Sequence, residues 1–228
     1  MNPIINIWRG LDWARLTGIF LNVVPALICI TLHEISHGLV AYWMGDTTAK
    51  DAGRLTLNPI KHIDWWGLLM MVIFQFGWAK PVPINMYRFK NPKKGMAVTA
   101  LAGPVSNLLI ACVALALYGF VYAPLYGTAV GGYFLQGIGI TAYLSTALAV
   151  FNIIPIPPLD GSKVLFACLD NRRYAWLMRY ERFGFLILIA LVTTGVLTAP
   201  LSAATGWVYD KLFSISEFTF SLTGKIAR

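Results

Sequence analysis

Charged residues are scarce in this chain of 228 residues. Only 12% of the residues are Asp, Glu, Lys or Arg, and 10 of them are acidic, whereas 57% of the chain is hydrophobic. About 25% of the residues in a typical soluble domain are charged. This composition argues against a soluble protein, and we expect a polytopic membrane protein in contact with the lipid bilayer.

Cysteine is also scarce. The chain has three cysteines, Cys29, Cys112 and Cys168, which lie among apolar residues and form no Cys-x-x-Cys pair. A disulfide framework is therefore not expected, and we interpret the cysteines as packing residues. Internal repeats, low-complexity tracts and polar linkers are absent as well. We therefore expect a single transmembrane domain over residues 1–228.

Long apolar runs predict an all-α membrane domain of about four to six helical segments. The runs cover residues 16–43, 68–79, 96–121, 133–154 and 183–199. A last stretch, 201–222, mixes aromatic residues with Asp210, Lys211 and Glu217, so we expect it to lie at the membrane interface. We assign the catalytic core to about 16–165 and the C-terminal span with this interfacial segment to about 180–228.

A metal-binding pattern lies inside the first apolar run. Residues 33–37 read His33-Glu34-Ile35-Ser36-His37. On a helix, histidines four residues apart project from one face and can bind one zinc ion, with Glu34 beside them as a general base. The pattern predicts a zinc metalloprotease site at membrane depth.

Other functions could explain ionisable groups in such a segment. An ionised side chain at the bilayer centre costs about 3 kcal/mol on insertion scales, so these groups need a partner. A membrane zinc or proton transporter and a catalytically silent membrane scaffold remain alternatives. A transporter would place polar groups along several spans, often in repeated halves. The titratable groups of this chain cluster at one depth, which favours the protease.

A catalytic zinc usually takes three protein ligands, so a third must come from elsewhere in the chain. Asp160 stands out, because it follows a proline-rich stretch, 155–158, that interrupts the preceding helix. Asp-Gly after prolines is also an ordinary turn signal. His62 and Glu181 are the alternative ligands.

The position of Asp160 tests the topology. If 68–79 crossed the membrane fully, Asp160 would emerge on the face opposite to the end of the first span. About twelve residues are few for a span, so we expect a re-entrant or extended element around 65–90. The loops 45–95 and 155–182 then share one face. They carry most of the Lys and Arg residues, which places this face in the cytoplasm and explains the net charge of +8 without nucleic acid.

Several motifs together resemble those of the short-form site-2 proteases, which are intramembrane zinc metalloproteases of peptidase family M50. The resemblance covers about 20–164. It depends on the sequences HEISHG at 33–38, GRLTLNPIKH at 53–62, GWAKPVP at 77–83, AGPVSN at 102–107 and NIIPIPPLDG at 152–161.

The resemblance implies a three-helix catalytic core with one zinc ion per chain, held by His33, His37 and Asp160, and with Glu34 as general base. It implies cleavage of membrane-anchored proteins within the bilayer of a prokaryotic cell, and extended structure embedded in the membrane around 68–79. We expect neither a PDZ nor a CBS domain.

Polar residues outside this set have less certain roles. Asn107 and Asn152 could bind the oxyanion or the substrate backbone, or could simply link helices. A surface or interfacial role is the default for His62, with contact to substrate or metal as the alternative. The segment 78–84 could pair with an unwound substrate by edge addition, or its prolines could shape a loop. The residues predict neither the identity of the substrate nor the oligomeric state.

Overall fold

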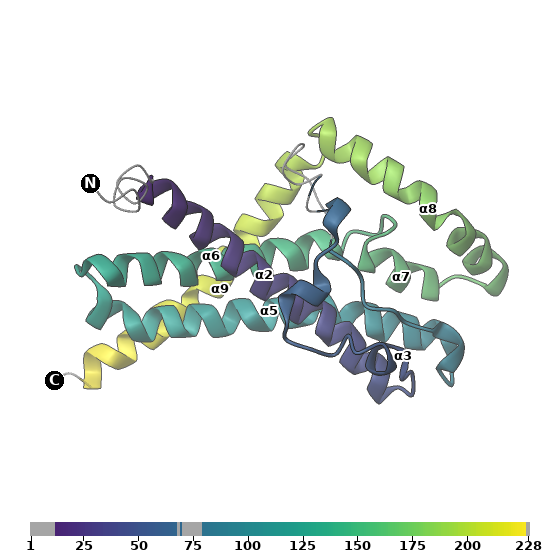
Figure 1. Ribbon diagram of the computed structural model, residues 1–228, viewed down its shortest axis with the longest axis horizontal. Coiled ribbons are helices and arrows are strands. Elements are labelled where there is room, and N and C mark those ends of the chain that lie inside the picture. Colours follow the sequence, from purple (N-terminus) through teal and green to yellow (C-terminus); the bar gives the residue numbers. More distant parts are fainter. Residues whose placement is uncertain (1–11, 68, 70–78, 227–228) are drawn as a thin grey trace, which may run out of the picture.

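The computed structural model describes residues 12–67, 69 and 79–226, and its architecture is helical (Figure 1). Four long helices form the body: α2 (Trp13–Trp43), α5 (Pro92–Leu125), α6 (Ala129–Asn152) and α9 (Thr198–Ile226). Within the described residues, the only β pairing is an isolated bridge between Ile63 and Ala79. The predicted all-α class is confirmed.

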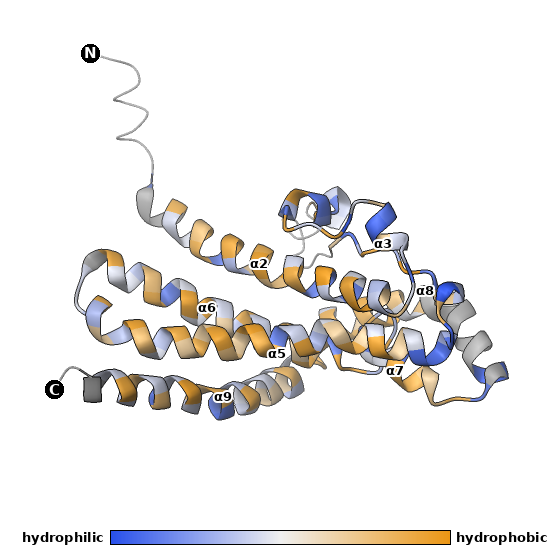
Figure 2. Cartoon of the chain, turned by 90° about the horizontal axis from the view of Figure 1, so that it is seen from below, coloured by the Kyte–Doolittle hydropathy of each residue, from blue (hydrophilic) through white to orange (hydrophobic). Residues whose placement is uncertain are grey.

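Three helices are long and apolar enough to cross a membrane. These segments are Leu16–Trp43, Pro92–Leu125 and Val130–Asn152, with 28, 34 and 23 residues. At 1.5 Å per residue, each exceeds the roughly 30 Å of a bilayer core. Hydrophobic residues occupy much of the length of these helices (Figure 2). They correspond to the predicted runs 16–43, 96–121 and 133–154.

The C-terminal part differs from the prediction. Helix α8 (Asn171–Thr193) and α9 meet at a bend of 86°, so the predicted run 183–199 is not one helix. Gly195 takes φ +74, a conformation that ends a helix. The division predicted near residue 200 therefore lies a few residues too late, because α9 begins at Thr198 and Pro200 sits in its first turn, where its missing N–H costs nothing.

Helix α9 packs against the other helices. Its Tyr209, Leu212 and Phe213 contact a core cluster formed by α5 and α6. If α8 and α9 form one bent span, the described residues contain four spans, and otherwise three. Four spans would be the lower end of the predicted range, and three would be below it. The interfacial location predicted for 201–222 stays a prediction.

The short connecting elements gather at one end of the bundle. Helices α3 (Thr48–Asp51) and α7 (Asp160–Ala167) lie at the end opposite to the start of α2 and the end of α9 (Figure 1). The 3-10 turns η1 (Pro59–His62) and η2 (Met86–Arg88) belong to the same connecting segment as α3. Loops before α5 and after α6 therefore share one face, as the crossing argument predicted. Within the predicted element around 65–90, residues 68 and 70–78 lie outside the described part of the chain. Residues 79–85 form no helix, Ala79 makes the bridge with Ile63, and the backbone of Asn85 is extended.

Candidate metal centre

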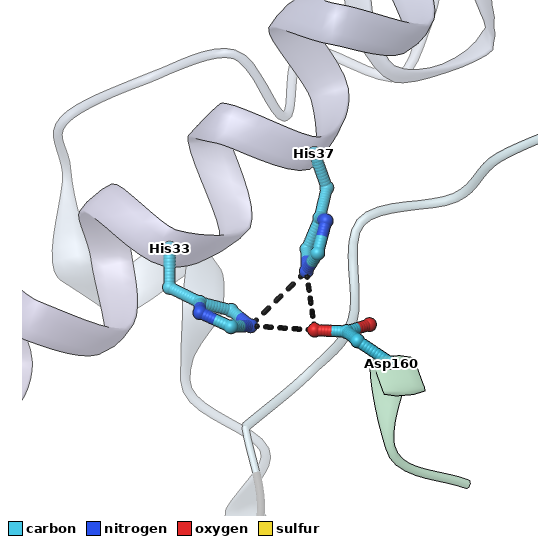
Figure 3. A group of neighbouring side chains, drawn as sticks. All are labelled: His33, His37 and Asp160. Carbon is cyan, nitrogen blue, oxygen red and sulfur yellow. Dashed lines mark hydrogen bonds and ion pairs between the residues drawn. The ribbon is translucent and has the colours of Figure 1, made fainter. Parts of the chain in front are cut away.

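Helix α2 and the first residue of α7 bring the three predicted ligands together (Figure 3). The Nε2 atoms of His33 and His37 lie 3.2 and 3.1 Å from Oδ2 of Asp160. The two Nε2 atoms are 3.0 Å apart. All three side chains are buried. Convergence of two imidazoles and one carboxylate is the donor set of a catalytic zinc site.

The environment of Asp160 supports a bound cation. Its Oδ2 is fully buried and has no hydrogen bond of good geometry, although both imidazoles are near. Burial raises the pKa of Asp160, but contacts with His33 and His37 lower it more, so its pKa lies well below the ordinary value. The carboxylate is therefore ionised and available to a metal. The residues present fit zinc.

Helix α5 holds the far side of both imidazoles. Nδ1 of His37 donates to the carbonyl oxygen of Thr99 at 2.7 Å, which directs Nε2 toward Asp160. Nδ1 of His33 lies 3.1 Å from the amide Nδ2 of Asn107, whose Oδ1 is buried without a partner. When His33 binds a metal through Nε2, its Nδ1 carries the proton. A turned amide of Asn107 then offers Oδ1 as the acceptor.

A cavity of about 570 Å³ opens beside the three ligands. Its wall is mostly apolar and includes Glu34 and Asn152, but not Asn107, which lies behind His33. Glu34 is half-buried, and its Oε2 accepts a hydrogen bond from the backbone N–H of Val82 at 2.8 Å. The Nδ2 of Asn152 donates to Leu148 O within α6 at 3.0 Å, so it must rotate to reach a substrate.

Lys163 also lines this cavity, and the sequence analysis missed it as a site residue. Its Nζ lies 3.9 Å from Oδ1 of Asp160, one helical turn earlier. Lys163 follows Asp160 by three residues, and residues i and i+3 share a helix face. This spacing could have predicted that Lys163 lies beside Asp160. That inference needs a helix beginning at Asp160, and the prolines had indicated only a turn there.

The two alternative ligands are not part of this cluster. His62 is 2% exposed, and its Nε2 donates to Thr56 O at 2.9 Å. The expected surface location is wrong, because this bond closes the 56–62 loop around the imidazole. His62 does not line the cavity either. Glu181 belongs to α8, but its side chain lies outside the described part of the chain.

Gly103 of α5 lies directly against the two imidazoles. A Cβ at this position would come within 2.5 Å of Cε1 of His33 and of Cε1 and Nε2 of His37. Real Cβ contacts are not that short, so the histidines would have to move. Helix α5 therefore needs glycine here to approach the ligands.

We expect Gly103→Ala to weaken zinc binding by about tenfold or more, since overpacking typically costs about 1–3 kcal/mol. Zinc retained by the purified protein during titration with a chelator measures the effect. Gly206→Ala in α9 is the matched control, because nothing lies within 4 Å of the added Cβ. Equal zinc retention in both variants would contradict close packing at Gly103.

Comparisons with known proteins agree with this geometry. The family model described as peptidase family M50 matches residues 126–194. The chain is 36% identical over 189 residues to "Putative zinc metalloprotease YwhC" of Bacillus subtilis, covering 81% of this chain and 83% of that protein. It is 28% identical over 229 residues to "Putative zinc metalloprotease Rip2" of Mycolicibacterium smegmatis, covering 97% of this chain and 86% of that protein. No solved structure matches significantly. The chain belongs to peptidase family M50, the site-2 protease family, and is a multi-pass membrane zinc metalloprotease.

Proposed function

We propose that this protein is an intramembrane endopeptidase that cleaves membrane-anchored proteins within their transmembrane segments. The observation that supports it most is the buried cluster of His33, His37 and Asp160. Both histidines belong to the segment Leu16–Trp43, which is long and apolar enough to span the bilayer. A peptide bond of a transmembrane segment that enters this cavity would move from the lipid to a position beside His33, Glu34, His37 and Asp160.

His33, His37 and Asp160 would hold one zinc ion, with imidazole Nε2 atoms and a carboxylate oxygen as ligands. A zinc ion held by these residues would supply Lewis-acid polarisation of the scissile carbonyl and a water of lowered pKa. Glu34 lines the same cavity and acts as general base. Its Oε2 is held by Val82 N–H, which leaves Oε1 to take the proton and pass it to the leaving nitrogen.

Polar groups on the cavity wall would hold the substrate. The Asn152 amide, after rotation, and the Lys163 ammonium can donate to a developing oxyanion. A helical substrate hides its peptide bonds, so it must unwind before cleavage. The segment 79–84 can accept the unwound strand by edge addition.

We place the protein in a prokaryotic cell membrane as one transmembrane domain, with the cavity toward the cytoplasm. The loops at the cavity end contain most of the Lys and Arg residues, whereas the turn between α5 and α6, 126–128, contains none. The positive-inside rule supports this orientation.

Cleavage-site mapping tests the proposal. The Glu34→Gln variant is expressed in cells, and bound substrates are joined to it with a chemical crosslinker. The trapped proteins are then identified by mass spectrometry. A trapped single-span protein is then incubated with the unaltered enzyme in liposomes, and the product termini are sequenced. We expect new termini inside the apolar span, and none after zinc chelation. Cleavage confined to exposed loops, or cleavage that survives chelation, would contradict intramembrane metalloproteolysis.

A further inference from the structure

A segment without helix, residues 79–85, lies against α2 beside Glu34, and we call it the strap. Pro81 and Pro83 have no N–H, so Val82 supplies the only amide hydrogen between them. That hydrogen is donated to Oε2 of Glu34 at 2.8 Å. The strap lies close to α2, because a Cβ at Gly38 would come within 3.1 Å of Cγ1 of Val82.

The start of the strap is fixed by the 54–62 loop. Lys80 donates its backbone N–H to His62 O at 2.9 Å. Its carbonyl oxygen accepts a hydrogen bond from Nη2 of Arg54 at 2.7 Å. Arg54 is buried, and a charged donor strengthens this bond. His62 thus supports the strap through its backbone carbonyl oxygen, while its imidazole holds the 56–62 loop.

Asp46, just after α2, fixes the end of the strap. Its side chain is fully buried. Oδ2 accepts the backbone N–H of Asn85 at 2.6 Å. Oδ1 accepts the backbone N–H of Thr48 at 3.0 Å and the Thr48 hydroxyl. One carboxylate therefore binds Thr48, the first residue of α3, with one oxygen and holds the strap with the other.

We propose that Asp46 is a positioning residue for proteolysis, because it holds the strap where Val82 N–H orients the Glu34 carboxylate. The strap forms no helix, and its prolines cannot donate. Val82 is buried and Ile84 packs against a core cluster, and the bonds at Lys80 and Asn85 add the polar contacts that fix its two ends. Release at Asn85 would let Val82 leave Glu34. The catalytic consequence rests on the proposed role of Glu34, whereas the anchoring of the strap does not.

Asp46→Asn and Thr48→Ala form a matched pair. Asparagine keeps an oxygen for the Thr48 N–H but turns an NH₂ toward the Asn85 N–H, so two donors face each other. Thr48→Ala removes the hydroxyl contact and leaves the bond to Asn85 intact. Hydrogen exchange of the 79–85 amides in the zinc-loaded protein, followed by mass spectrometry, reports the strap directly.

We expect exchange of the Val82 amide to be about tenfold faster or more in Asp46→Asn, and nearly unchanged in Thr48→Ala. Zinc content should be equal in both, because no ligand belongs to the strap. On a trapped substrate, Asp46→Asn should lower kcat about tenfold or more and leave KM nearly unchanged. If Asp46→Asn does not fold, Arg54→Met, which releases Lys80 O, should give the same changes.

If the Val82 amide exchanges at the same rate in Asp46→Asn and in Thr48→Ala, Asp46 does not anchor the strap. Faster exchange in Asp46→Asn with unchanged kcat would overturn the positioning of Glu34. If the unaltered enzyme cleaves no membrane protein, the proposed function fails, and the exchange measurement still decides whether Asp46 holds the strap.

Discussion

Replacing Asp160 by asparagine is expected to remove most of the zinc from the purified protein. Oδ2 of Asp160 lies within 3.2 Å of both imidazole Nε2 atoms, so it completes the donor set. Asparagine keeps the shape of the side chain but removes the negative charge. Loss of an outer-shell partner typically weakens metal binding about 10–100-fold, and loss of a direct ligand should cost more. Metal analysis after gel filtration in detergent measures the zinc per chain.

Asp170→Asn is the matched control. It also removes one carboxylate near the start of a helix, where the Asp170 side chain caps α8, and asparagine caps well. We expect about one zinc ion per chain in this variant, as in the unaltered protein. If Asp160→Asn retained the same amount, Asp160 would not be a ligand. Glu181, whose side chain lies outside the described residues, would then be the next residue to replace.

The central part of this site could be predicted from the sequence because local rules determine it. Helical spacing places His33 and His37 on one face. The cost of burying their charges required a partner, for which Asp160, His62 and Glu181 were candidates. The count of crossings showed that Asp160 could reach the same end, and the family resemblance selected it. Each step uses the period of a helix or the thickness of a bilayer. These constraints are visible in a single sequence.

The contacts that support the site could not be predicted in this way. The bond from Val82 to Glu34 joins residues 48 positions apart, and the bond from Asn85 to Asp46 joins residues 39 apart. Their formation depends on the path of an irregular loop, which has no periodicity. Gly103 could not be predicted as a site residue for the same reason. Its position excludes any side chain only because the imidazoles of another helix, α2, lie against it. The role of Asp46, which belongs to none of the sequence motifs, therefore emerges only from the folded chain.

Glu34→Gln is expected to abolish proteolysis while zinc remains bound. Glutamine has nearly the size of glutamate, and its amide oxygen can still accept the Val82 N–H. The three zinc ligands are untouched. Glutamine cannot take a proton from water, and general bases typically contribute about 10²–10⁴ in rate. Cleavage of a trapped single-span substrate in liposomes should slow by that factor, with an unchanged zinc content.

Glu217→Gln provides the matched control, because Glu217 is exposed on α9 and does not line the cavity. It should cleave at the rate of the unaltered enzyme. Full activity in Glu34→Gln would contradict the role of Glu34 as general base. Loss of zinc in the same variant would instead mean that Glu34 holds the site together. A catalytically silent scaffold would keep its function in the Glu34→Gln variant. A variant that keeps its zinc but no longer cleaves the substrate therefore shows that Glu34 acts in catalysis and not only in forming the site.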